Sequence, residues 1–502
     1  MHDVRPALIQ ALLAPGLYPG KVHEVTLIET HISWVLLAGE YAYKIKKPVK
    51  LPFLDFSTLA LRQQFCETEL QLNRRFAPEL YLDVEAITGK PEHPVWGGEG
   101  APIEYAVKMR RFDEAGRLDH LCAQGALTPD HVSALAQRIV HFHDQAAIAP
   151  ESSRFATPDE ILAPVMDNFD GLQRLLHGTL AQSQLARLHD WSRLEFDRLG
   201  ALLVARKVAG RVRECHGDLH LGNIALIDGI PTLFDCIEFS ESLRWIDTAS
   251  EIAFVYIDLL DHRQPGLASW FLNEWLQASG DHEAVPLLRF YAVYRAMVRA
   301  KVAAIRREQT GEDDGLCSAY LALAGRLISP SKPRLVITHG LSGCGKTVAS
   351  SQLLQHDASG MTLRLRSDVE RKRLFGLAPQ EKSHSGVAAG IYGQQASEQT
   401  YAHLMALARR QLQAGWSTVV DAAFLQHAER DAFARLALEL GVDFFILAPQ
   451  ASPAQLRARI LARQAQGHDA SEANLEVLER QMVSVQPLSD QERTRLLSMA
   501  TR

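Results

Sequence analysis

The sequence predicts two domains of different fold class: a first domain of α+β type and a second domain of α/β type with a doubly wound parallel sheet. Short runs with strand periodicity precede residue 110, and long helical patterns continue from there to residue 328. The segment 329–333, S-P-S-K-P, then stops a helix, and strand patterns resume after it. We therefore expect one domain over 1–330 and a second over 334–502, joined by this linker.

The composition of the 502-residue chain is that of a globular protein with more than one core, because 47% of its residues are hydrophobic and 22% are charged. The formal net charge of −6 gives no overall attraction to nucleic acid, so a nucleic-acid partner is not favoured. No apolar run reaches the roughly 18 residues of a membrane helix, and the first residues lack the apolar core of a signal peptide. The six cysteines include no C-x-x-C pair, which indicates free thiols in a cytoplasmic protein without a membrane partner.

The first domain is expected to begin with a small antiparallel sheet. Its strand runs are 25–28, 32–37 and 41–46, and a helix follows over 57–76. Lys44 and Lys46 fall on one face of the third strand because strand side chains alternate. The helix carries Glu67 and Glu69, and a strand lysine with a helix glutamate is the pair that holds the α- and β-phosphates of ATP in kinases. We take Lys44 and Glu69 as this pair. Lys46 and Glu67 remain as alternatives.

A further strand is expected over 103–109, after which the pattern becomes helical. The helical segments are 128–145, 157–177, 181–207, 266–280 and 284–328. The first domain therefore divides into a small lobe over about 20–110 and a helical lobe over about 111–328.

The stretch H-G-D-L-H-L-G-N over residues 216–223 carries the chemistry of the first domain. Asp218 and Asn223 are separated by four residues. At this spacing a kinase loop places the base that takes the proton of the attacking hydroxyl and a ligand of the metal ion.

A hairpin is expected directly after this stretch. Two apolar runs, 224–227 and 232–234, are joined by Asp228-Gly229, a strong signal for a tight turn. The hairpin ends at Asp235, where a second carboxylate ligand for Mg²⁺ is expected.

These residues, H-G-D-x-H-x-x-N with F-D after the hairpin, resemble the aminoglycoside phosphotransferase (choline kinase-like) branch of the protein-kinase fold. The resemblance implies a protein-kinase-like fold for the first domain, with ATP and Mg²⁺ as cofactors. It implies Asp218 as the catalytic base and Asn223 and Asp235 as metal ligands. It also implies that the backbone after the last strand bonds adenine and that Asp247 braces the catalytic loop. No G-x-G-x-x-G precedes these strands, so the loop around 30–33 is expected to cover the phosphates.

The second domain opens with a complete G-x-x-x-x-G-K-T motif, which stands between a strand over 334–339 and a helix. Backbone N–H groups are expected to wrap the phosphates of ATP at the helix N-terminus, and they come from Gly340, Ser342, Gly343, Cys344 and Gly345. Lys346 meets the β- and γ-phosphates and takes part in the transfer, and the Thr347 hydroxyl binds Mg²⁺.

Two carboxylates follow strands of the second sheet. Asp368 comes after a strand over 363–366, and Asp421 ends a buried strand over 416–420. Ligands bind at the carboxyl ends of the strands in a doubly wound sheet, so Asp368 is expected beside the nucleotide. Asp421 is expected in the water shell of the metal ion as a Walker B carboxylate. A helix N-cap is the alternative role for Asp368.

The segment S-D-V-E-R-K over 367–372 resembles the zeta-toxin, gluconate kinase and polynucleotide kinase group of small P-loop kinases. This resemblance implies that Asp368 binds or deprotonates the acceptor hydroxyl and that Arg371 contacts the substrate.

A basic helix over 456–463 resembles the lid of such kinases, where arginines neutralise the charge on the moving phosphoryl group. Arg459 and Arg463 lie on one face at i and i+4, and a lid turn is expected over 467–471. A solvated basic face is the alternative. The two halves together resemble bacterial bifunctional aminoglycoside phosphotransferase/ATP-binding proteins over nearly the whole chain.

The sequence thus predicts an ATP-dependent phosphotransferase with two nucleotide sites and a small-molecule hydroxyl acceptor, such as a metabolite, a sugar or a nucleotide. Aminoglycosides do not follow as substrates, because fold likeness alone does not identify the acceptor. One alternative is an ATP-binding sensor or toxin-like regulator in which one domain gates the other. A second is a polynucleotide end kinase, which the basic stretch 364–373 favours and the net charge opposes.

Overall fold

The computed structural model describes residues 6–51, 54–329, 332–383, 385, 389–466 and 470–497. Contacts group the chain into two compact units. One unit holds Met1–Leu127, His141–Ile161 and Leu202–Val255, and the other holds Thr128–Val140, Leu162–Ala201 and Tyr256–Arg502. The linker expected over 329–333 includes residues 330 and 331, which lie outside the described residues, so the domain boundary stays a prediction.

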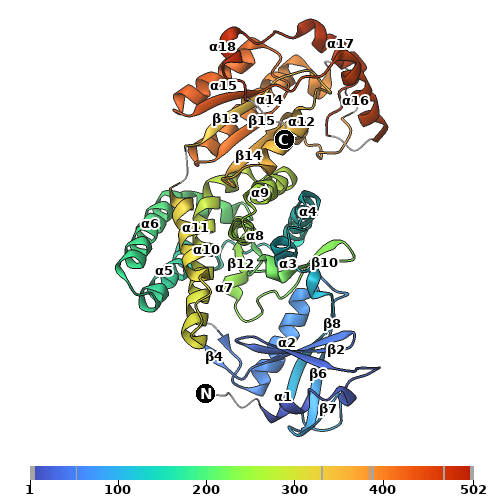
Figure 1. The fold of residues 1–502 in the computed structure, drawn as a ribbon, viewed down its shortest axis with the longest axis vertical. Helices are drawn as coiled ribbons and strands as arrows, with labels where there is room; N and C mark the ends of the chain where they lie inside the picture. The colour runs from blue at the N-terminus through green and yellow to red at the C-terminus, as the bar shows by residue number, and fades with distance from the viewer. Residues whose placement is uncertain are drawn as a thin grey trace. The chain divides into compact units, whose positions relative to one another are not determined.

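A six-stranded antiparallel sheet forms the N-terminal part of the first unit (Figure 1, blue). In spatial order its strands are β1 (Val25–Glu29), β2 (Ser33–Ala38), β3 (Tyr41–Lys46), β8 (Glu104–Arg110), β6 (Tyr81–Lys90) and β7 (His93–Trp96). The sequence predicted β1, β2, β3 and β8 but not the β6–β7 hairpin. The reason is that β6 lacks strict alternation of buried and exposed residues, and its pairing with β8 shifts register between Tyr81 and Asp83.

The two faces of this sheet differ because side chains alternate along β3. On one face, Tyr43 and Ile45 are buried in an apolar cluster with Ile9 of α1 (Ala7–Ala11). On the other face, Lys44 and Lys46 meet α2 (Leu59–Asn73), the helix that the sequence predicted over 57–76. The ionic face is therefore the one that leads to the candidate site.

Two small two-stranded sheets hold the H-G-D stretch. β9 (Val212–Glu214) pairs with β12 (Trp245–Asp247), and β10 (Ile224–Ile227) pairs with β11 (Ile230–Leu233). The predicted turn at Asp228-Gly229 is confirmed, because both residues have left-handed φ values, 51° and 77°. The H-G-D stretch runs from the end of β9 to the start of β10.

The chain between β8 and residue 329 is otherwise mainly helical. Its longer helices are α4 (Pro129–Gln145), α5 (Pro158–Leu175), α6 (Thr179–Val208), α8 (Thr248–Asp261), α9 (Pro265–Ser279), α10 (Val285–Thr310) and α11 (Leu316–Ile328). The stretch predicted as helical over 284–328 is divided into α10 and α11, because Gly311 and Gly315 have left-handed φ values of 75° and 73°. Within the described part of the chain, no helix is long and apolar enough to cross a bilayer.

A four-stranded parallel sheet organises the C-terminal part of the second unit (Figure 1, orange). In spatial order its strands are β14 (Thr362–Arg366), β15 (Ser417–Asp421), β13 (Arg334–Thr338) and β16 (Asp443–Leu447). The helices around it are α12 (Lys346–Gln355), α13 (Ser367–Leu374), α14 (Gln394–Gln413), α15 (His427–Glu439), α16 (Pro453–Gln466), α17 (Leu475–Ser484) and α18 (Asp490–Arg493).

Both faces of this parallel sheet are covered. Leu335 and Ile337 of β13 belong to an apolar cluster with residues of α14 and α15, whereas Val336 belongs to a second cluster with Ala349 and Leu353 of α12. Alternate residues of one strand are thus buried on opposite faces, as in a doubly wound sheet. The predicted fold classes, α+β first and doubly wound α/β second, are confirmed.

Candidate functional site

The H-G-D stretch places Asp218 and Asn223 side by side. Asn223 Nδ2 donates a hydrogen bond to the backbone carbonyl of Asp218 (2.9 Å). His220 Nδ1 accepts from the N–H of Gly222 (3.1 Å), so its Nε2 carries the proton, and this atom lies 3.6 Å from Asp218 Oδ2. The Asp218 side chain is 38% exposed, whereas Asn223 is buried. The carboxylate is therefore accessible to an incoming hydroxyl while its backbone is fixed.

Glu251 of α8 holds the start of this stretch. Its carboxylate accepts hydrogen bonds from the backbone N–H groups of His216 (2.9 and 3.0 Å) and Gly217 (3.2 Å), and it is fully buried. Burial opposes the ionisation of Glu251, but the His143 imidazole and the N–H groups outweigh it and lower the pKa of Glu251 to about 2. A single carboxylate thus orients the backbone that leads to Asp218.

Glu251 makes the contacts that the resemblance implied for Asp247. The Asp247 carboxylate instead receives the guanidinium of Arg206 (2.6 and 2.7 Å) and accepts a hydrogen bond from the N–H of Ala249 in the first turn of α8 (2.8 Å). The signal for Glu251 in the sequence is an acidic residue at the start of a mostly apolar helix, which also contains Asp258 and Asp261.

A metal ion does not fit around Glu251. Ligand atoms of His143, Cys215 and Glu251 lie within 4.8 Å of one another, and all three residues are buried. However, both Glu251 oxygens already accept the backbone N–H of His216. A carboxylate engaged in this way has little capacity left for a metal ion.

Asp235 follows β11 in a left-handed conformation, with φ at 63°. This conformation is costly for a residue other than glycine, and its neighbours hold it in place. The N–H of Asp235 donates to the Tyr81 hydroxyl (3.0 Å), and the N–H of Cys236 donates to Asn73 Oδ1 (2.9 Å). Asn73 Nδ2 in turn donates to the backbone carbonyl of Glu69 (2.9 Å), which ties α2 to the segment after β11. Neither Tyr81 nor Asn73 carries a local sequence signal for this task.

A buried ionic network connects α2, β3 and Asp235. Lys44 Nζ bonds Glu69 Oε1 (2.8 Å) and also Asp235, and Lys46 Nζ bonds Glu69 Oε2 (2.7 Å) and also Glu238. The structure thus brings Lys44 and Glu69 together and adds Lys46 to the same glutamate. Glu67, the other candidate, is exposed and accepts a hydrogen bond from Gln63.

Burial and neighbouring charges both shift the pKa values of the residues in this network. Burial opposes the charge on Lys44, but Asp235 and Glu69 raise its pKa well above the usual value. Burial likewise opposes the ionisation of Asp235, and Lys44 nevertheless lowers the pKa of that carboxyl. At Glu238 burial prevails and raises the pKa. Lys44 and Asp235 are therefore both charged at neutral pH.

Mg²⁺ suits the oxygen atoms offered at this site. The Asp235 carboxylate is ionised. Asn223 donates through its Nδ2 to the Asp218 carbonyl, which leaves the Oδ1 of Asn223 available as an oxygen ligand. A carboxylate and an amide oxygen are ligands that a hard cation prefers. The chemistry of this donor set is consistent with the predicted metal role of both residues.

The second candidate site is the glycine-rich loop between β13 and α12. Lys346 Nζ donates to the backbone carbonyls of Gly340 (2.8 Å) and Leu341 (2.9 Å), so the loop curls around its own lysine. The N–H of Ser342 donates to Gln481 Oε1 of α17 (2.8 Å), a contact for which the sequence carries no signal. The predicted loop residues Gly343, Cys344, Gly345 and Thr347 complete this turn into α12.

Asp421 lies at the carboxyl end of β15 and is 5% exposed. Its Oδ2 accepts a hydrogen bond from Ser350 Oγ (3.1 Å), and Ser350 lies one turn of α12 after Thr347. The structure thus brings Asp421 to the helix that carries the predicted metal ligand. Asp421 and Thr347 offer only oxygen atoms, a donor set that suits Mg²⁺.

Asp368 lies in the first turn of α13, directly after β14, and is partly exposed. The N-cap residue of α13 is Arg366, so the alternative of an N-cap role for Asp368 is not what the structure shows. Arg371 is only 8% exposed, and its guanidinium donates to the backbone carbonyl of Ile391 (2.8 Å) and to Ser397 Oγ (3.3 Å). Arg371 is thus bonded to the segment around Ile391, and its contact with the substrate stays a prediction.

The two predicted lid arginines make different contacts. Arg459 Nη1 lies 3.3 Å from the backbone carbonyl of Gly343 and 3.4 Å from that of Cys344, so this side chain reaches the glycine-rich loop. Arg463 Nη2 donates to the backbone carbonyl of Ala473 (2.8 Å) instead. Of the lid turn expected over 467–471, residues 467–469 lie outside the described residues.

Three of the five cations in the basic stretch over 364–373 are buried, whereas Arg366 and Arg373 are partly exposed. Arg364, Arg371 and Lys372 are 7%, 8% and 1% exposed, so these cations are inside the protein. Phosphate contacts need exposed cations, and the observation opposes the polynucleotide alternative.

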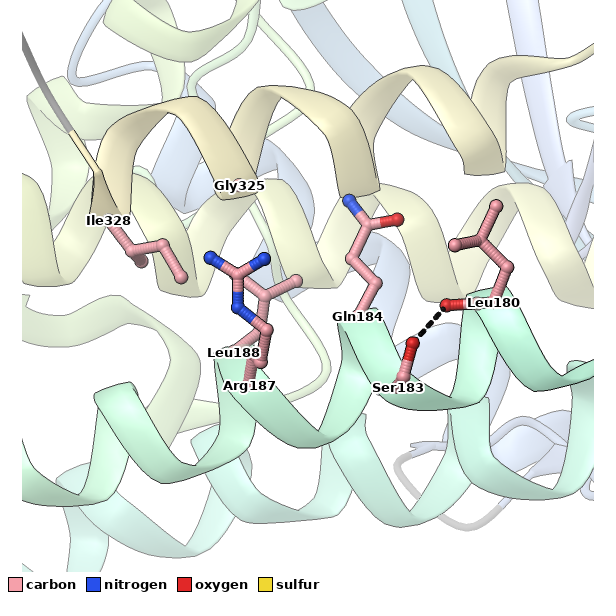
Figure 2. A pocket seen from close by; sticks show the side chains of 7 residues that line it. All are labelled: Leu180, Ser183, Gln184, Arg187, Leu188, Gly325 and Ile328. Carbon is pink, nitrogen blue, oxygen red and sulfur yellow. Dashed lines mark hydrogen bonds between the residues drawn. The ribbon is translucent and has the colours of Figure 1, made fainter.

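A small cavity lies between α6 and α11 (Figure 2). Its volume is about 160 Å³, and it is lined by Leu180, Ser183, Gln184, Arg187, Leu188, Gly325 and Ile328. Ser183 Oγ donates to the backbone carbonyl of Leu180 within α6 (3.0 Å), and Gln184 Nε2 donates to that of Leu321 (2.8 Å), which joins α6 to α11. None of the predicted site residues lines this cavity.

Comparison with known proteins gives a family match in the C-terminal part. A family described as "AAA domain" matches residues 335–488, in agreement with the predicted P-loop domain. Among curated proteins, uncharacterized protein Rv2004c of Mycobacterium tuberculosis and uncharacterized protein Mb2027c of Mycobacterium bovis are each 28% identical over 448 residues. The alignment covers 88% of this chain and 87% of each relative.

Solved structures similar to this chain include two described as kinases. Choline kinase LicA from Streptococcus pneumoniae is 15% identical, with a TM-score of 0.40, over 64% of this chain and 98% of its own. A choline/ethanolamine kinase family protein from Mesorhizobium loti is 13% identical, with a TM-score of 0.40, over 64% of this chain and 94% of its own.

Proposed function

We propose that this chain is an ATP-dependent phosphotransferase with two nucleotide sites, and that it transfers the γ-phosphate to a hydroxyl group of a small molecule. The observation that supports it best is the ionic network of the first unit. Lys44, Glu69 and Asp235 come from β3, α2 and the segment after β11, and they meet in one cluster in which Glu69 is buried and Asp235 is partly exposed. A lysine held between a helix glutamate and a metal-binding aspartate is the arrangement that phosphoryl transfer from ATP requires.

At the first site, the Asp218 carboxylate takes the proton of the acceptor hydroxyl as the hydroxyl oxygen attacks the γ-phosphorus, the bond from that phosphorus to the β,γ-bridging oxygen breaks, and ADP leaves. Asn223 fixes Asp218 through its backbone carbonyl, and Glu251 fixes the preceding turn. Asn223 and Asp235 would hold Mg²⁺, which neutralises the charge on the phosphate oxygens when bound. Lys44 moves from Asp235 to the α- and β-phosphates while Glu69 retains it.

At the second site, the N–H groups of the glycine-rich loop bind the phosphates, and Lys346 exchanges the carbonyls of Gly340 and Leu341 for phosphate oxygens. Thr347 and Asp421 would hold Mg²⁺ and its water shell. Asp368 is the proposed base toward the acceptor, and Arg459 lies where it can contact the phosphoryl group in transfer. Arg463 is the weaker candidate because its guanidinium contacts Ala473.

A second candidate function is an ATP-binding sensor in which one nucleotide site gates the other. The observation that favours it is the grouping of residues 256–502 into one compact unit, which contains the helices α9, α10 and α11 as well as the P-loop sheet. A nucleotide at the glycine-rich loop could then influence the helices that precede it.

The test is ATP consumption with identification of phosphorylated products by mass spectrometry, in a cell-metabolite extract. Wild type is compared with Asp218→Asn and Lys346→Ala. A phosphorylated metabolite that disappears in one variant only assigns an enzyme activity and an acceptor to that site. If neither variant changes any product while both bind ATP at the intact site, the phosphotransferase proposal is wrong and the sensor replaces it.

A further inference from the structure

Helix α9 carries one polar side chain every four residues, at Ser269, Asn273 and Gln277, and all three face the P-loop sheet. Four residues of an α-helix rise by about 6.0 Å, and two residues of a strand rise by about 6.6 Å. The polar row of α9 therefore matches alternate residues of a strand laid beside it. The strand it meets is β14, at the edge of the parallel sheet (Figure 1).

Each polar residue of the row bonds this edge. Asn273 Nδ2 donates to the carbonyl of Thr362 (3.0 Å), and Asn273 Oδ1 accepts from the N–H of Arg364 (2.5 Å). Ser269 Oγ accepts from the N–H of Thr362 (3.3 Å), and Gln277 Oε1 accepts from Arg366 Nη1 (3.3 Å). The Asn273 amide thus gives β14 the donor and acceptor that a neighbouring strand would give, and this edge is closed by a helix.

The contact is dry and close. Ser269 is fully buried and Asn273 is 3% exposed. At Gly266, a Cβ atom would lie 1.9 Å from the backbone carbonyl oxygen of Gln355 at the end of α12, so only glycine permits this approach. Helix α9 cannot shift along β14 without losing these bonds together.

The C-terminal end of α9 and the turn after it also hold α13. The backbone carbonyl of Gln277 accepts from Arg373 Nη2 (2.6 Å), and His282 Nε2 lies 3.1 Å from Glu370 Oε1. The segment from β14 through α13, which includes Asp368, is therefore bonded to α9 and the turn after it at both ends. The glycine-rich loop, by contrast, follows β13, which β15 and β16 flank on both sides.

We infer that α9 is a positioning element of the P-loop site, and that Asn273 fixes the first half of β14 at Thr362 and Arg364, and thereby the strand that leads to Asp368. This inference rests on the proposed role of Asp368 as the base toward the acceptor. It predicts that loss of the Asn273 amide impairs transfer to the acceptor and leaves nucleotide binding at the loop intact, because the two halves of the site are held by different elements.

The test uses the full chain with Asn273→Leu, which keeps the side-chain size and removes both hydrogen-bonding groups. The matched control is Asn168→Leu, a buried asparagine of α5 whose Nδ2 has no hydrogen-bond partner. Hydrogen exchange by mass spectrometry should show at least about tenfold faster exchange over 362–374 in Asn273→Leu, since about 1.4 kcal/mol of lost bonding corresponds to a factor of ten. The control should leave this segment unchanged.

The functional readout separates positioning from a general loss of structure. The rate of Asp368-dependent product formation should fall about tenfold in Asn273→Leu, whereas the Lys346-dependent affinity for an ATP analogue should stay within about twofold. Unchanged exchange over 362–374, or an equal loss of nucleotide affinity, would overturn the inference.

Two further outcomes are also decisive. If Asn273→Leu does not fold, Ser269→Ala removes one bond of the row and should raise exchange over the same segment by a smaller factor; no rise there contradicts the inference. If wild type forms no Asp368-dependent product, the proposed chemistry of the P-loop site fails, and the exchange rates alone decide whether α9 holds this segment.

Discussion

The two candidate sites hold the lysines that are predicted to bind phosphate by opposite kinds of contact, one ionic and one neutral. Lys44 is held by two carboxylates, those of Glu69 and Asp235, in a buried network. Lys346 is held by two neutral backbone carbonyls of its own loop. An ion pair with a buried carboxylate costs more to break than a bond to a carbonyl. The first site is thus a cluster of charged side chains, and the second is a loop closed by neutral hydrogen bonds.

The largest effect is expected at the base of the first site. Asp218→Asn should lower first-site product formation about a thousandfold, because proton removal by a positioned carboxylate contributes on that scale. Turnover measured by mass spectrometry of the product checks this. Nucleotide binding at both sites should stay as in wild type, and a loss of ATP affinity without loss of turnover would contradict the assignment.

The buried lysine of the network should matter next. Lys46→Met leaves Glu69 and Glu238 with less positive charge nearby and should lower the free energy of unfolding by about 3–5 kcal/mol. Lys47→Met is the matched control, because Lys47 pairs with the half-exposed Glu29 and should change stability by about 1 kcal/mol or less. Urea denaturation of the two variants measures the difference. Equal losses of stability would show that the buried ion pairs of Lys46 stabilise the fold no more than the exposed pair of Lys47, which contradicts the description of the first site as a charged cluster.

Acid should act on the first site through Glu251. Its pKa of about 2 in the folded protein lies below the unfolded value of 4.5, so its ionised form stabilises the fold above pH 4.5. This contribution, about 3 kcal/mol, is lost as the pH falls from 4.5 towards 2. The difference in Tm between wild type and Glu251→Gln should therefore be large at pH 7 and shrink below pH 4.5. A difference that stays constant with pH would show that the charge of Glu251 contributes nothing.

The smallest effect is expected from the lid arginines of the second site. Arg459→Ala should weaken binding of an ATP analogue with Mg²⁺ about fivefold, because one charge-assisted contact is lost. Arg463→Ala should leave this affinity unchanged, since Arg463 contacts the carbonyl of Ala473. Titration calorimetry, with Lys346→Ala to identify the second-site component, compares them. Equal losses of affinity in the two variants would show that both arginines contact the nucleotide.

The sequence predicted what depends on spacing along the chain. Both fold classes and the Asp228-Gly229 turn follow from local patterns, and the structure confirms them. The pairing of Lys44 with Glu69 was predicted from the kinase pattern of a strand lysine and a helix glutamate, and the structure adds Lys46, the alternative lysine, to the same glutamate. The roles of the site residues themselves remain predictions, because they concern chemistry with ligands.

What the sequence could not predict depends on contacts between distant segments. Glu251 bonds a turn 35 residues earlier, and Tyr81 bonds a backbone N–H 154 residues later. Arg371 looks like a surface cation in the sequence, yet its guanidinium is covered by the segment around Ile391. The β6–β7 hairpin was missed because β6 lacks the strict alternation of buried and exposed residues by which strands are recognised.

The closure of β14 by α9 also has a consequence for biosynthesis. Asn273 precedes Thr362 by 89 residues, so the ribosome makes the helix well before the strand that it covers. Chains fold from the N-terminus as they emerge. The edge of β14 therefore meets its cover within the same polypeptide as soon as it is synthesised, before it can pair with an edge of a neighbouring nascent chain. A truncated gene that begins after α9 would lose this protection and is expected to yield aggregates.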